Sequence, residues 1–263
     1  AERKQIEGKT AAAIRGYEDY LNEFPNGLHA QNANFALAQL YFADGDKDKA
    51  LPRYRAVADG GNGEYTEQAL TRVCEIYVDK QDYGSAIPYL KRLESTADIS
   101  ENKTFAQSNL MKGYYGQKDY AQTIAYAEKV LDAPKIDDRI KSDAQIMIAR
   151  SAIATDNGNL AKTAYQDVKQ IASGELAAEA WYYDAFFKNK EQAYEASNEA
   201  VQKLAKDYAA YKEWAGKGLV IMAKNFYNLG DAFQATYILE SVISNFAEFE
   251  EIVSDAENEL ATI

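Results

Sequence analysis

Residues 45–54 read GDKDKALPRY, a turn-forming run that leads to a small residue, Ala50, and then to an aromatic residue four places on, Tyr54. The same order, with an aromatic or aliphatic residue after the small one, recurs every 35 to 39 residues. We call the small residues the anchors, and they are Ala13, Ala50, Ala86, Thr123, Ala161, Ala196 and Ala235. Such regular spacing predicts an array of repeated supersecondary units.

A second position, twelve residues before the anchor, also requires close helix packing. We call its residues the markers, and five units hold there Ala38, Cys74, Met111, Ala149 and Ala223. An apolar residue precedes each marker, and an aromatic residue commonly follows three places later, which is the spacing of one helix face. Between marker and anchor lies a run such as 44–46, whose Gly and Asp favour a helix end and the next helix start. The pattern therefore predicts that each unit consists of a helix, a tight turn, a second helix and a connection to the next unit.

These motifs resemble tetratricopeptide repeats, and the resemblance covers almost the whole chain. It rests on residues 45–54 and on Lys118-Asp119-Tyr120, which is similar to the family's usual turn. The last unit, residues 229–243, resembles the C-terminal unit of long tetratricopeptide proteins of Bacteroidetes cell envelopes. The resemblance implies an all-α fold: a right-handed α-α superhelix (solenoid) of about six to seven helical hairpins with a C-terminal capping helix.

We expect one solenoid domain over residues 1–263. Its parts are a half-unit at 1–28, repeats at 29–63, 64–100, 101–138, 139–174, 175–210 and 211–247, and a cap at 248–263. Few residues precede Ala13, so either the chain is a fragment of a longer array or residues 1–22 pack as a lone cap. An open N-terminal end would also allow self-association. The fifth unit is the least regular, because Asp184 occupies its marker position.

The C-terminal residues predict a short amphipathic helix. Its inner side carries Ile252, Val253, Ala256 and Leu260, and its outer side carries Glu251, Asp255 and Glu259. A terminal unit of a repeat array needs such a polar outer face for solubility.

Composition narrows the function. Asp and Glu number 41 against 29 Lys and Arg, a net charge of −12, which argues against nucleic-acid partners. No run approaches the roughly 18 apolar residues of a membrane span. The family resemblance implies a bacterial periplasm or cell envelope, although the single cysteine fits a reducing cytoplasm equally well.

Catalytic chemistry is poorly represented. His29 is the only histidine and lies at an expected helix start, while Cys74 occupies a packing position. Asp44-Gly45-Asp46-Lys47-Asp48 imitates the start of a calcium loop but lacks the required later Gly and Glu, at Lys49 and Arg55. We therefore expect no enzyme, no cofactor and no metal.

In tetratricopeptide proteins the first helix of each hairpin lines a concave groove. Positions three before, one after and four after each marker give its lining: Phe35, Gln39, Phe42, Thr71, Glu75, Val78, Ser108, Lys112, Tyr115, Ile146, Arg150, Ile153, Val220, Lys224 and Tyr227. Three cations among apolar groups predict a protein or peptide segment of acidic character as partner. The expected function is a non-enzymatic scaffold or adaptor. The alternative is a glycan- or nutrient-binding surface protein on the same frame.

Overall fold

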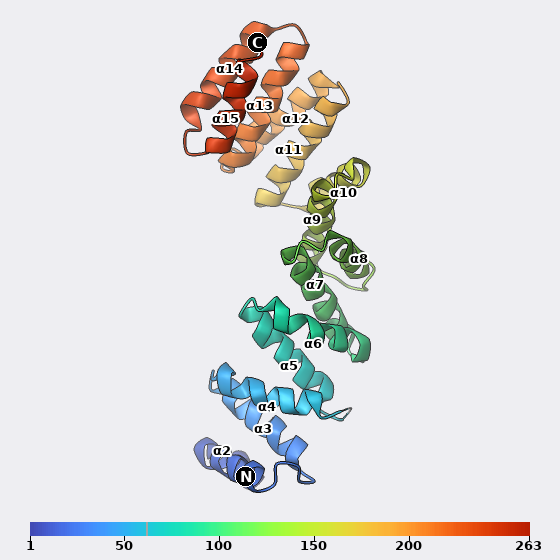
Figure 1. Ribbon diagram of the computed structural model, residues 1–263, viewed down its shortest axis with the longest axis vertical. Helices are drawn as coiled ribbons and strands as arrows, with labels where there is room; N and C mark the ends of the chain where they lie inside the picture. The colour runs from blue at the N-terminus through green and yellow to red at the C-terminus, as the bar shows by residue number, and fades with distance from the viewer. Residues whose placement is uncertain (62) are drawn as a thin grey trace. The chain divides into compact units, whose positions relative to one another are not determined.

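A computed structural model describes residues 1–61 and 63–263, and its regular secondary structure over those residues is entirely α-helical. The helices form two compact units, Ala1–Val130 and Leu131–Ile263, which are called here the first unit and the second unit (Figure 1). Within each unit, helices that follow one another in sequence pack as antiparallel neighbours. The all-α array of helical hairpins predicted from the repeat spacing is therefore confirmed.

The helices up to the boundary between the units are α1 (Glu2–Ile6), α2 (Thr10–Glu23), α3 (Ala30–Ala43), α4 (Lys47–Asp59), α5 (Thr66–Asp79), α6 (Tyr83–Thr96), α7 (Ser100–Gly116) and α8 (Tyr120–Leu131). Those that follow are α9 (Asp138–Ala154), α10 (Gly158–Ile171), α11 (Gly174–Lys190), α12 (Tyr194–Asp207), α13 (Lys212–Asn228), α14 (Ala232–Asn245) and α15 (Glu250–Leu260). Within a unit, the first helices of some successive hairpins also touch, as α5 touches α7 and α11 touches α13.

One turn geometry joins the two helices of every hairpin. The residue before the second helix's N-cap has a positive φ, between 54° and 87°, at Gly8, Gly45, Gln81, Lys118, Asp156, Gln192 and Gly230. The next backbone N–H then donates to the carbonyl five residues earlier, as Asp46 does to Tyr41 at 2.9 Å. In several turns an Asp or Asn side chain also caps the second helix, as Asp46 does by accepting from the Lys49 N–H. Backbone geometry thus fixes the register of each hairpin.

This geometry corrects the register of the fifth repeat, the pair α11–α12, by one residue. Gln192 has the positive φ and Ala193 is the N-cap of α12, so the anchor is Ser197, not Ala196. The marker twelve residues earlier is Ala185, not Asp184. Both Ser197 and Ala185 are fully buried, and the Ser197 hydroxyl donates to the Ala185 carbonyl at 2.7 Å. The helix pair α11–α12 is otherwise regular.

Cys74 and the C-terminal helix behave as packing elements. Cys74 is fully buried on α5, and burial raises the pKa of its thiol to about 12. On α15, Ile252 and Ala256 are buried against the α13–α14 hairpin. Glu259, expected on the outer face, is instead half-buried and pairs with Lys224 of α13 at 2.7 Å. No helix of the described residues combines the length and apolar character that crossing a bilayer demands.

Candidate functional site

The predicted groove residues differ widely in exposure. Phe35, Ile146 and Val220 are buried, so they can form only the floor of a groove. Gln39 and Tyr227 are exposed, and the half-buried remainder comprises Phe42, Thr71, Glu75, Val78, Ser108, Lys112, Tyr115, Arg150, Ile153 and Lys224. Four of the fifteen, in the first unit, come together around one pocket.

This pocket, of about 280 Å³, lies between α3 and α5 and is called here the α3–α5 pocket. Its lining consists of Phe35, Gln39, Tyr54, Gln68, Thr71, Arg72, Glu75 and Asn102. Tyr54, Gln68, Arg72 and Asn102 were not among the predicted groove residues. Tyr54 was not predicted as a groove residue because its repeat position is typical of the core. The other three do not lie three before, one after or four after a marker.

The lining is polar but electrically balanced. The Arg72 guanidinium pairs with the Glu75 carboxylate at 2.5 Å and lies over the Phe42 ring, 4.9 Å from its centroid. Asn102 donates its amide to Glu67 at 2.8 Å. Gln39 and Gln68 are uncharged and exposed. The charges at this pocket are therefore compensated within the protein.

Aromatic rings make the floor. Phe35 stacks on Tyr65 with ring centroids 4.4 Å apart and meets Tyr54 edge-on at 6.1 Å. Tyr54 also meets Phe42 edge-on at 6.1 Å. Such packing holds the Tyr54 ring in one orientation, with its hydroxyl in the wall of the pocket.

The Tyr54 hydroxyl is unusual among the tyrosines at its repeat position. Tyr54 is 2% exposed, burial raises its pKa, and its hydroxyl makes no hydrogen bond to any residue of 1–61 or 63–263. Tyr17 and Tyr165 also lie four residues after an anchor. Their hydroxyls donate to Gln5 and Glu179, each at 2.8 Å. The Tyr54 hydroxyl is not among the fully buried polar atoms that lack a partner, so it opens on the pocket as a donor that no described residue uses.

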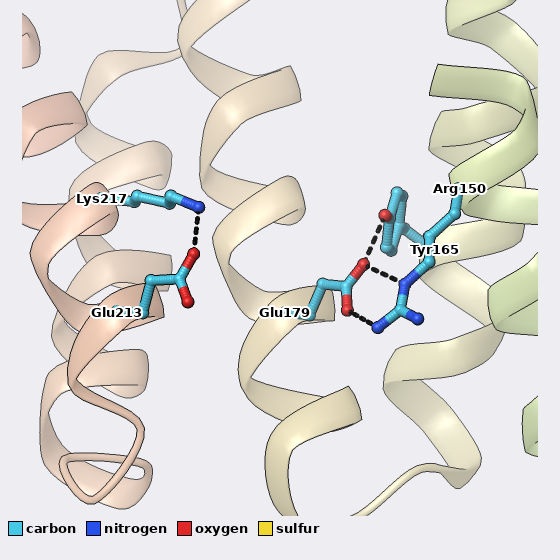
Figure 2. A network of polar contacts seen from close by, with 5 residues as sticks. All are labelled: Arg150, Tyr165, Glu179, Glu213 and Lys217. Carbon is cyan, nitrogen blue, oxygen red and sulfur yellow. Dashed lines mark hydrogen bonds and ion pairs between the residues drawn. The ribbon is translucent and has the colours of Figure 1, made fainter. Parts of the chain in front are cut away.

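In the second unit the corresponding region is filled by a polar network (Figure 2). Arg150 of α9 donates to both carboxylate oxygens of Glu179 on α11, from Nε at 3.0 Å and from Nη2 at 2.5 Å. Glu179 is 2% exposed and also accepts the Tyr165 hydroxyl. The Lys217–Glu213 pair drawn beside it lies on α13 alone. Arg150, predicted as a groove cation, therefore serves an internal ion pair.

The last predicted groove residues are also engaged. Lys224 pairs with Glu259 of α15, and the Tyr227 hydroxyl donates to the Thr262 carbonyl at 3.3 Å. Arg150 and Lys224, on which an acidic partner was predicted, are thus bound by the chain itself.

A larger pocket, of about 460 Å³, lies one repeat before the α3–α5 pocket. Tyr17 and Asn32 occupy in it the repeat positions that Tyr54 and Gln68 hold in the next. His29, exposed at the start of α3, is part of its wall. Within the described part of the chain, no group of three or more His, Cys, Asp or Glu side chains is arranged to hold a metal ion.

No protein-family model and no curated protein matches the chain by sequence. Solved structures match its fold. The C-terminal part of a tetratricopeptide repeat-containing protein from Cytophaga hutchinsonii has a TM-score of 0.61 at 11% identity, over 97% of each chain. A signal-transduction ATPase with a tetratricopeptide repeat sensor from Pyrococcus horikoshii gives 0.59 at 12% identity, over 98% of this chain and 44% of that one. Pseudomonas aeruginosa PilF gives 0.50 at 16% identity, over 80% and 91%. The chain has the tetratricopeptide-repeat fold.

Proposed function

We propose that this chain is a non-enzymatic interaction module that binds a segment of a partner protein in the α3–α5 pocket. The observation that carries the proposal is the Tyr54 hydroxyl, a donor without a hydrogen-bond partner among the described residues, on a side chain that is 2% exposed and lines a pocket of about 280 Å³. The aromatic floor offers apolar contact, and the exposed amides of Gln39 and Gln68 offer hydrogen bonds. These are the features of a site that orients a bound group.

The proposal places binding in the first unit. In the second unit, the Arg150–Glu179 pair and the Lys224–Glu259 pair occupy the predicted groove cations. A partner there would have to replace a bidentate ion pair whose arginine is half-buried and whose carboxylate is buried, and leaving such a carboxylate without its counter-charge costs roughly 3 kcal/mol. The α3–α5 pocket requires no such exchange.

The proposed absence of catalysis is supported by the two residues best suited to it. His29 is exposed, and the Cys74 thiol has a pKa of about 12 because it is buried, so it stays protonated at neutral pH. Neither side chain lines the α3–α5 pocket.

Selection of random nonapeptides on the full chain tests the proposal. We expect binders whose affinity falls at least tenfold in Thr71→Arg, because the long side chain fills the pocket. Thr163→Arg is the matched control. Both threonines are helical and donate to the carbonyl four residues earlier, but Thr163 is exposed on α10, far along the chain. No binders, or equal loss in both variants, would refute a site at α3–α5.

We also propose a bacterial cell envelope as the compartment, supported by the resemblance of residues 229–243 to envelope proteins. Fractionation of source cells tests this, and recovery of the protein in the cytoplasm would reject it.

A further inference from the structure

We infer that the α3–α5 pocket recognises a side-chain carboxamide, the end group of Gln or Asn, presented by the bound segment. The inference rests on the proposed function and names the chemistry of its ligand. Three observations support it: the repeat register of the pocket residues, the unpartnered Tyr54 hydroxyl, and the charge balance of the lining.

The first observation is that the pocket and the polar network use the same repeat positions. Gln39 and Arg150 each follow a marker by one residue. Tyr54 and Tyr165 come 15 residues later, and Gln68 and Glu179 a further 14 residues on. The Glu179 assignment depends on the corrected register, with Ala185 as marker. The two triplets are therefore equivalent positions on equivalent helices: Gln39, Tyr54 and Gln68 in the first unit, and Arg150, Tyr165 and Glu179 in the second.

The second observation is that these equivalent positions are occupied differently. In the second unit, the carboxylate of Glu179 reaches the tyrosine hydroxyl and the guanidinium, and all three groups are joined. In the first unit, Gln68 accepts no hydrogen bond from Tyr54 within the described residues, and the side chain lines the pocket from its exposed position. An acceptor from outside the chain can therefore take the place that the Glu179 carboxylate occupies beside Tyr165.

The third observation is charge, which selects the acceptor. Glu179 is balanced by Arg150, but Gln39 holds the equivalent position without a charge. Arg72, the cation of the pocket, is already neutralised by Glu75 at 2.5 Å. A carboxylate or an ammonium placed beside Tyr54 would lose water without gaining a free counter-charge, which is costly.

A carboxamide fits without that cost. Its carbonyl oxygen accepts from the Tyr54 hydroxyl, and its NH₂ group donates to the side-chain oxygen of Gln39 or Gln68. The methylene stem of a glutamine lies against the Phe35 ring. One carboxamide can therefore form hydrogen bonds both to the Tyr54 hydroxyl and to an uncharged amide of the pocket.

The experiment uses capped nonapeptides taken from the selection described above, with one position changed among Gln, Glu and Met. We expect the selected peptides to share a Gln or Asn at one position. Changing it to Glu should weaken binding at least tenfold, and changing it to Met about fivefold, from the loss of hydrogen bonds. Tyr54→Phe should weaken the Gln peptide about fivefold and leave the Met peptide unchanged. Selected peptides that fix an acidic, basic or apolar residue there would overturn the inference while leaving the proposed function intact.

A second variant tests the register argument directly. Gln39→Arg with Gln68→Glu copies the second-unit triplet into the first unit, where it should join Tyr54 and close the pocket. We expect binding of the Gln peptide to fall more than tenfold with unchanged helicity by circular dichroism. Tyr165→Phe, in the second unit, should leave peptide binding unchanged. Full binding by the double variant would overturn the inference, whereas a selection that yields no binders would remove the proposed function as well.

Discussion

The hairpins α3–α4 and α9–α10, each taken with the helix that follows it, place the same three repeat positions in two different chemical states. On α9, α10 and α11 the positions hold Arg150, Tyr165 and Glu179, which join in one network. On α3, α4 and α5 they hold two glutamines and Tyr54, and a pocket remains. The comparison teaches that the repeat backbone sets where these side chains lie. Their charge then decides whether the chain fills the space itself.

The largest effect should come from breaking the ion pair of the second unit. Arg150→Met leaves the Glu179 carboxylate, 2% exposed, without its counter-charge, and should lower the free energy of unfolding by about 3 kcal/mol. Gln39→Met, at the equivalent position, should change it by less than about 0.5 kcal/mol because Gln39 is exposed. Urea denaturation followed by circular dichroism measures both. Equal losses in the two variants would mean that the positions do not differ as described.

A smaller effect should follow from removing the two tyrosine hydroxyls separately. Tyr165→Phe takes one donor from a buried carboxylate and should lower the free energy of unfolding by about 1.5 kcal/mol. Tyr54→Phe removes a hydroxyl with no partner in the described chain, and should change stability by less than about 0.5 kcal/mol. The same denaturation experiment compares them. A large loss in Tyr54→Phe would show that its hydroxyl is paired within the protein.

The smallest of the losses expected in the second unit should come from converting it to the chemistry of the first. Arg150→Gln with Glu179→Gln removes both charges and keeps groups that can hydrogen-bond to Tyr165. We expect a loss of about 1 kcal/mol, less than in Arg150→Met, because no unpaired charge stays buried. If the double variant were as unstable as the single one, packing rather than charge would account for the network.

Most of the fold followed from the sequence because turns and small residues are local signals. Gly45 and Asp46, for example, favour by themselves the left-handed residue and the N-cap that the structure contains. The turn of the fifth repeat lacks the Gly and Asp signals. It has Gln192 and Ala193 in their place, and the adjacent Ala196 and Ser197 are both small enough to be anchors. Burial and the Ser197 hydrogen bond were needed to choose between them.

The candidate site was predictable only in part. Counting from the markers selected Phe35, Gln39, Thr71 and Glu75, which do line one pocket. The same counting treated Arg150 as a groove cation, because its partner Glu179 lies 29 residues away on the next hairpin. That pairing depends on the spatial approach of α9 and α11 and on the register of the unit whose turn was ambiguous. The repeat spacing does not indicate which side chains of different hairpins form such a pair.

Cys74 provides a built-in chemical reporter of the pocket wall. It is the chain's only cysteine, fully buried on α5 next to Glu75, and its thiol is protonated at neutral pH. A thiol reagent can modify it only when α5 opens, so the labelling rate reports the free energy of that local opening. A ligand seated between α3 and α5 would slow the labelling in proportion to its occupancy. Binding could then be followed by mass spectrometry on the unmodified protein, with no added dye.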